Sequence, residues 1–347
     1  MKRKTNSADK QGNLPRTARR ANQAAIHGTQ VRIKARRKLI QSTKLAAVTG
    51  TLAATLLGCN TEHASVGFGK TGMIEAVGAE AQYSNVIKAI GGKFVRVSTM
   101  INNPNVDPHD FQAGTNDAKK VAQATLVVQN GLGYDSFMTQ LESATQNPKR
   151  TVIEAGTLVR GTAGKTNPHV WYKPGEMNKV ATAVASALIK QDGAHKQVYE
   201  KNLSKFQTSM HTWQSQIQDL RKHYRNAPVA VTEPVADYLL HAGGLQIKTP
   251  WSFEAAVMNG IDPSPEAIRT EKNLLTKHLV KLLIYNPQAT DTVSESLLKL
   301  ARENHIPIVA AYETLPPGYD YASWMTAETK NIENALRTGQ STETMIK

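Results

Sequence analysis

Two histidines of this chain stand directly behind a proline, in an Asp-Pro or Asn-Pro step. His109 lies in "NPNVDPHDF" (103–111), and His169 lies in "NPHVW" (167–171). Proline fixes its own φ and disfavours helix for the residue before it, so each imidazole sits on a stiffened loop and has little entropy left to lose. That arrangement suits a metal ligand, although it is also compatible with an ordinary turn.

Two glutamates stand at the ends of predicted strands. Glu233 follows the apolar stretch "VAVT" at once, and Glu313 follows "IPIVAAY". In open α/β sheets, binding sites form at the carboxyl ends of the strands. Together with His109 and His169, these carboxylates would supply four ligands for one divalent first-row transition metal.

Each of these residues also has a simpler explanation. Glu233 precedes a proline and could serve as a carboxylate at a helix N-terminus, stabilised by the helix dipole. Glu313 could cap a turn, and Asp320 in "PPGYDY" competes with it for the role of fourth ligand. Residue types and spacing alone therefore leave the four-ligand site as one interpretation among several. The other histidines that we expect at the surface or at helix ends are His195, His211, His223, His241, His278 and His305.

The elements that must position these residues alternate regularly along the chain. Predicted strands lie at 73–79, 93–101, 125–131, 151–155, 229–232, 245–247, 280–286 and 306–312. Predicted helices lie at 80–90, 116–124, 174–190, 234–244, 264–278, 291–305 and 321–336. This β-α-β rhythm predicts an α/β fold of mostly parallel sheets covered by helices. No P-loop or GxGxxG motif interrupts it.

A long apolar seam separates the two β/α regions. Its members are spaced alternately four and three residues apart: Tyr199, Leu203, Phe206, Met210, Trp213, Ile217 and Leu220. The pattern predicts one rigid helix of about 45 Å that joins two β/α lobes. A coiled coil is the alternative, but only about four heptads are present and nothing similar flanks them. The expected divisions are 1–58 (signal peptide with an extended basic region), 59–70 (tether), 71–193 (first lobe), 194–225 (connecting helix) and 226–340 (second lobe).

The positive charge is concentrated at the N-terminus. Residues 1–44 carry thirteen Lys/Arg and one acid, a net charge of +12 that leaves +2 of the total +14 for the remainder. No basic stripe with interleaved aromatics remains, so we expect no nucleic-acid partner. The apolar run Leu45–Leu57 is too short to span a bilayer and suits the core of a signal peptide. It ends in "LLGC", where Cys59, the only cysteine, resembles the lipid-modified cysteine of a bacterial lipobox. The alternative is a buried N-terminal helix with an unused thiol.

Four stretches give the chain a family resemblance: "NPNVDPHDFQAGTNDAKKVAQATLVVQNGLGYDSFM", "NPHVWYKP", "VAVTEPVADYLL" and "YETLPPGYDYASWM". In this order they resemble the zinc- and manganese-binding solute-binding proteins of bacterial ABC transporters, the ZnuA-like cluster. The resemblance extends from about residue 70 to about residue 338. The resemblance implies two β/α lobes with the metal held between them. Matched motif by motif, it implies His109, His169, Glu233 and Glu313 as the metal ligands. Glu313 departs from the pattern, because the fourth ligand of the family is usually Asp.

The expected function is metal capture outside the cytoplasm. The resemblance implies a monomeric lipoprotein, anchored to the cell envelope through Cys59, that binds Zn²⁺ or Mn²⁺ as transported cargo and delivers it to an ABC permease. Two imidazoles with two carboxylates favour Mn²⁺, but Zn²⁺ binds most such sites more tightly. The sequence therefore does not decide between the two metals. We expect no enzymatic activity. The alternatives are a metallohydrolase, which four protein ligands and the lack of HExxH disfavour, and an adhesin-like surface protein with a structural metal.

Overall fold

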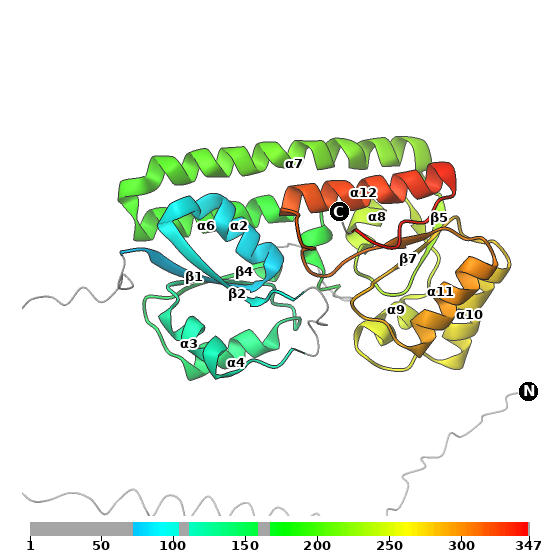
Figure 1. The fold of residues 1–347 in the computed structure, drawn as a ribbon, viewed down its shortest axis with the longest axis horizontal. Helices are drawn as coiled ribbons and strands as arrows, with labels where there is room; N and C mark the ends of the chain where they lie inside the picture. Colours follow the sequence, from blue (N-terminus) through cyan, green and yellow to red (C-terminus); the bar gives the residue numbers. More distant parts are fainter. Residues whose placement is uncertain (1–71, 104–110, 159–166, 346–347) are drawn as a thin grey trace, which may run out of the picture. The chain divides into compact units, whose positions relative to one another are not determined.

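The computed structural model describes residues 72–103, 111–158 and 167–345, and these contain two parallel four-stranded sheets (Figure 1). The first sheet has the order β2-β1-β3-β4. Its strands are β1 (Ile74–Glu80), β2 (Val95–Ile101), β3 (Leu126–Gln129) and β4 (Thr151–Glu154). β1 and β3 are buried almost throughout, as expected of strands covered by helices on both faces. The predicted α/β class is therefore confirmed.

The helices of this first lobe follow the predicted alternation. They are α2 (Ala81–Gly91), α3 (Thr115–Gln123), α4 (Ser136–Ala144), α5 (Ala155–Leu158) and α6 (Glu176–Gln191), with short 3-10 turns η1 (Gly92–Phe94), η3 (Val170–Tyr172) and η4 (Gly193–His195). The sequence interpretation had assigned neither the four-residue α5 nor α4. This helix buries Phe137, Met138 and Leu141 against the sheet residues Val77 and Val127.

The second lobe repeats the topology of the first. Its sheet has the order β6-β5-β7-β8, so in both sheets the first strand in the chain lies between the second and the third. The strands are β5 (Pro228–Val231), β6 (Gln246–Ile247), β7 (Leu283–Tyr285) and β8 (Ile308–Ala310). The helices are α8 (Asp237–Ala242), α9 (Trp251–Met258), α10 (Pro265–Thr276), α11 (Thr292–Glu303) and α12 (Tyr321–Thr338), of which α9 had not been predicted.

One helix of 29 residues, α7 (Lys196–Tyr224), connects the two β/α regions. Both sheets belong to one compact unit of the chain, residues 64–347. Figure 1 shows α7 alongside α6 and α12, and its apolar seam packs on these helices and on α2. Six of the seven seam residues are buried and Leu203 is partly buried, which confirms a helix packed on its own chain. Among the described residues, no helix combines the length and apolarity that crossing a membrane requires.

Candidate metal site

The Asn-Pro-His step places His169 by a local hydrogen bond. The side-chain oxygen of Asn167 accepts the backbone N–H of His169 at 2.9 Å, which closes a turn around Pro168. The Pro168 carbonyl in turn accepts a bond from the Asn130 amide, at the carboxyl end of β3, at 2.9 Å. His169 is fully buried. The loop is therefore not an ordinary surface turn, because it places an imidazole in the interior.

The same asparagine also fixes the orientation of the ring. Asn167 Oδ1 lies 2.7 Å from Nδ1 of His169, while its amide nitrogen donates to the Pro234 carbonyl at 2.6 Å. Because the amide nitrogen faces a carbonyl, the oxygen is the atom that faces the ring, and Nδ1 must carry the proton. The other ring nitrogen, Nε2, is thereby directed to the opposite side of the imidazole. Tyr134 and Trp171 pack edge-on against the ring, with centroid distances of 5.8 and 5.2 Å, and limit its rotation.

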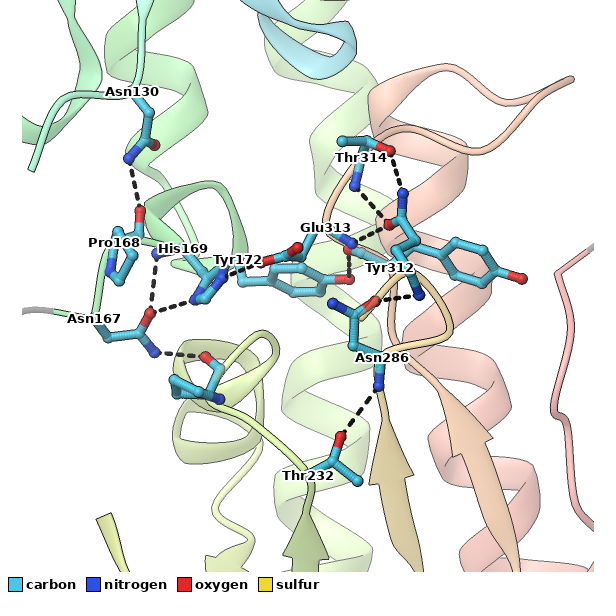
Figure 2. A network of polar contacts seen from close by, with 12 residues as sticks. Asn130, Asn167, Pro168, His169, Tyr172, Thr232, Asn286, Tyr312, Glu313 and Thr314 are labelled. Atoms are coloured by element: carbon cyan, nitrogen blue, oxygen red, sulfur yellow. Dashed lines mark hydrogen bonds and ion pairs between the residues drawn. The ribbon is translucent and has the colours of Figure 1, made fainter. Parts of the chain in front are cut away.

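Nε2 of His169 meets a carboxylate from the other lobe. Its distance to Oε1 of Glu313 is 2.7 Å, and both side chains are fully buried (Figure 2). The two residues are 144 positions apart in the sequence. The structure thus brings together one predicted ligand from each lobe in direct contact.

A turn after β7 holds the backbone of Glu313. The side-chain oxygen of Gln288 accepts the N–H groups of Glu313 and Thr314 at 2.6 and 3.0 Å, and its nitrogen donates to the Thr314 hydroxyl at 2.6 Å. Asn286 holds Gln288 in turn, because its side-chain oxygen accepts the Gln288 N–H at 2.9 Å. The segment "NPQ" therefore repeats the turn of "NPH". Sequence reasoning missed Asn167, Asn286 and Gln288, although the Asn-Pro step at the end of a strand was a usable signal.

Glu233 is connected to this pair through the next residue in the chain. It is 4% exposed, two residues after β5, and its neighbour Pro234 accepts the bond from Asn167. Within the described ranges, no three His, Cys, Asp or Glu side chains are grouped closely enough to hold a metal. Of the four predicted ligands, the structure joins His169 and Glu313 directly and leaves Glu233 one residue from their hydrogen-bond network.

Three residues named in the sequence interpretation have other outcomes. His109 and Cys59 lie outside the described residues. Asp320, the competitor of Glu313, is exposed and caps α12, since its carboxylate accepts the N–H of Ser323 at 2.8 Å. Glu313, and not Asp320, is therefore the acidic residue that faces His169.

Further hydrogen bonds tie the two lobes around the pair. The Tyr172 hydroxyl lies 2.8 Å from the Tyr312 carbonyl and also contacts the Glu328 carboxyl, which accepts the Tyr312 N–H at 2.9 Å. Burial raises the pKa of Glu328 to about 7 against the lowering effect of these bonds. The Tyr238 hydroxyl donates to the Asn167 carbonyl at 2.9 Å. Each predicted ligand that the structure describes is thus flanked by contacts between lobes.

The chemistry of this arrangement suits a divalent cation. A ring nitrogen and a carboxylate oxygen, both buried and pointing at each other, are the donor types that Mn²⁺ and Zn²⁺ accept. The second ring nitrogen is hydrogen-bonded, as that of a metal-binding histidine usually is. The site lies where strands of both sheets end, which is where open α/β folds bind their ligands.

Two parallel β/α lobes, a connecting helix and a buried polar site between the lobes define a two-lobed substrate-binding protein. The chain belongs to the family described as "Zinc-uptake complex component A periplasmic", whose profile matches residues 79–335. This membership confirms the resemblance drawn from the sequence motifs.

Individual relatives agree with the family. The chain is 24% identical over 285 residues to the metal ABC transporter substrate-binding lipoprotein FimA of Streptococcus parasanguinis, covering 77% of this chain and 88% of the relative. It is 24% identical to the manganese ABC transporter substrate-binding lipoprotein PsaA of Streptococcus pneumoniae, covering 68% and 78%. The structure of the substrate-binding protein FpvC from Pseudomonas aeruginosa in complex with Mn²⁺ has the same fold, with a TM-score of 0.64, 20% identity, and coverage of 76% and 98%.

Proposed function

We propose that this protein captures one Mn²⁺ or Zn²⁺ ion between its lobes and delivers it to the permease of an ABC transporter. The observation that carries the proposal is the 2.7 Å contact between Nε2 of His169 and Oε1 of Glu313 across the lobes. A cation lying between these two atoms would bind both. His109 and Glu233 would complete the ligand set, and the two glutamates would neutralise the charge of the ion.

The choice of metal follows from the ligands and the relatives. Two imidazoles and two carboxylates form a harder set than a site dominated by histidine, which favours Mn²⁺ over softer ions. The name of the S. pneumoniae relative specifies manganese, and the FpvC structure contains Mn²⁺. We therefore expect Mn²⁺ to bind, and Zn²⁺ to bind as well, because it ranks above Mn²⁺ at almost any site of N and O ligands.

The proposal includes the cellular setting. Residues 1–58 would direct export, Cys59 would carry a lipid anchor, and 59–70 would tether the protein to the extracytoplasmic side of the membrane. The lobes would span 71–193 and 226–340 around the helix of 194–225, in a protein that acts as a monomer. The names of FimA and PsaA, both substrate-binding lipoproteins, support this assignment.

Calorimetric titration of the full chain with MnCl₂ and with ZnCl₂ tests the proposal. One ion should bind per chain, and Glu313→Gln should weaken binding by about a hundredfold or more, because a charged ligand is lost. Glu271→Gln is the matched control, since Glu271 is equally buried in the same lobe but accepts a hydrogen bond from Thr249. Absence of stoichiometric binding, or equal affinity in Glu313→Gln, would contradict the proposal.

Metal-dependent hydrolysis and a purely structural metal are the competing functions. A hydrolytic zinc needs an open coordination position and a general base beside it. The family is named as a component of an uptake complex, which favours transport. Chelation should accordingly leave a folded metal-free protein, whereas a structural metal would leave the chain unfolded.

A further inference from the structure

The last residue of β1 is a buried glutamate that the fold does not explain. Glu80 has 0% exposure, and neither of its carboxylate oxygens has a hydrogen-bond partner in another residue that the structure describes. A buried carboxylate without a partner costs several kcal/mol, and natural proteins accept that cost where the group is needed. Glu80 does not cap the helix that follows it, although it occupies the N-cap position of α2. Its carboxylate is therefore available to an external ligand.

The position of Glu80 in the sheet points toward the site between the lobes. β1 lies between β2 and β3, at the point where the strand order reverses, and ligands of such sheets bind at the carboxyl ends of these strands. Glu80 pairs with Ile101, the last residue of β2. Two residues further on, Gln82 donates to the backbone carbonyl of Glu313 at 3.3 Å. The turn that begins at Glu80 thus contacts the same glutamate that meets His169.

A second chain of contacts leads from this turn to the histidine. The Tyr83 hydroxyl donates to the Asn130 side chain at 2.5 Å, and Asn130 donates to the carbonyl of Pro168, the residue before His169. Glu80 is therefore connected on one side to Glu313 and on the other to His169. The carboxylates of Asp135 and Glu313 contribute, after burial, to raising the pKa of Glu80 well above its ordinary value, so these groups lie within electrostatic reach.

The repeated topology gives Glu80 a counterpart. In the second lobe, the first strand β5 leads two residues later into Glu233, a predicted ligand that is also buried. Both sheets have the same strand order, so Glu80 and Glu233 stand at corresponding ends of corresponding strands. Each lobe thus places one glutamate at the carboxyl end of its central first strand, where the strand order of the sheet reverses.

We infer that Glu80 is a further carboxylate ligand of the captured ion and favours Mn²⁺ over Zn²⁺. The inference rests on the proposed function and adds a residue of the first lobe to its ligand set. A third carboxylate beside those of Glu233 and Glu313 makes the ligand set richer in oxygen, as the octahedral coordination of Mn²⁺ favours, whereas Zn²⁺ is satisfied by four ligands in a tetrahedron. Among the described residues these side chains are not grouped closely enough to hold an ion, so ion binding would have to draw them together.

The test compares Glu80→Gln with the wild-type full chain in titrations with MnCl₂ and with ZnCl₂. Gln keeps the size of the side chain and removes its charge. Mn²⁺ affinity should fall by about ten- to a hundredfold, and Zn²⁺ affinity by less than about threefold. Glu271→Gln, the same substitution at another fully buried glutamate, should change neither. Equal affinities of Glu80→Gln and wild type for Mn²⁺ would overturn the inference, as would equal losses for both metals.

X-ray absorption of the Mn²⁺-loaded proteins supplies a direct readout. The number of N and O atoms around Mn²⁺ should be lower by one in Glu80→Gln, and an unchanged number would overturn the inference. If Glu80→Gln does not fold, Glu80→Asp takes its place: its shorter carboxylate should weaken Mn²⁺ binding selectively, and unchanged binding would count against a ligand role. Failure of the wild type to bind any ion would instead refute the proposed function, so the two failures are distinguishable.

Discussion

The amide of Asn167 determines which nitrogen of His169 faces the site. It accepts from the backbone and from Nδ1 of His169 while donating to Pro234 in the other lobe. One side chain therefore sets the position, the tautomer and the direction of the imidazole. A group that does this without touching the metal acts as a positioning residue.

Asn167→Ala should weaken Mn²⁺ and Zn²⁺ binding by about ten- to a hundredfold, because the ring loses the partner that orients it. Calorimetric titration measures the change. Asn147→Ala is a suitable control, since the Asn147 amide also bonds two backbone carbonyls, those of Ala122 and Ala124, in a turn of the first lobe. Equal losses in the two variants would show a general structural effect and contradict the positioning role.

The residues of the site were only partly predictable from the sequence. The Asn-Pro-His step indicated His169 as a candidate ligand, because such a turn is formed by residues adjacent in the sequence. Glu233 and Glu313 were indicated by their positions at the ends of predicted strands. The choice between Glu313 and Asp320 depended on the fold, which makes Asp320 a helix cap. Asn167 and Gln288 bond to residues that are distant in the sequence, Pro234 and Glu313, so their roles could not be predicted without the fold.

At the scale of elements, alternation along the chain predicted all eight strands and most of the helices. Parallel strands are short apolar runs separated by helices, so their pattern is visible without tertiary contacts. Helices α4, α5 and α9 were missed. The buried residues of α9, Phe253, Glu254 and Met258, include a charged one and follow no clear stripe, since this helix is held by its neighbours in the second lobe.

Helix α10 contains a buried acid that makes stability depend on pH. Burial raises the pKa of Glu271 from an ordinary value of 4.5 to about 8, against the lowering effect of its bond from Thr249. Between these values the folded protein holds a proton that the unfolded chain has lost. The free energy of unfolding therefore falls as pH rises through this window, by up to about 1.4 kcal/mol per pH unit.

Glu271→Gln should remove this dependence and stabilise the protein by about 4 kcal/mol near pH 8, with little change near pH 4.5. Urea denaturation of the metal-free protein at both pH values measures the difference. Glu266→Gln, at an exposed position of the same helix, should show no such gain. A gain of the same size at low pH would indicate a packing effect and not the titration of Glu271.

At the scale of the whole molecule, the connecting helix limits how the lobes can move. α7 packs on α2 and α6 of the first lobe and on α8 and α12 of the second, and it buries Trp213 with a hydrogen bond to Thr329 at 2.9 Å. A wide hinge opening would have to break this apolar seam. Small movements of the turns at the strand ends require no such loss, so cation capture should be a local event.

Hydrogen–deuterium exchange with and without MnCl₂ tests this expectation. Binding should slow exchange in the turns that meet around the ion, at residues 80–83, 167–172, 232–236, 286–288 and 311–315. Exchange in α7 should stay unchanged, because this helix supplies none of the proposed ligands and its apolar face is already buried. The Glu313→Gln variant at the same MnCl₂ concentration provides the control and should show no slowing. Protection that spreads through α7 would indicate that the lobes close as hinged bodies, contrary to the packing of this helix.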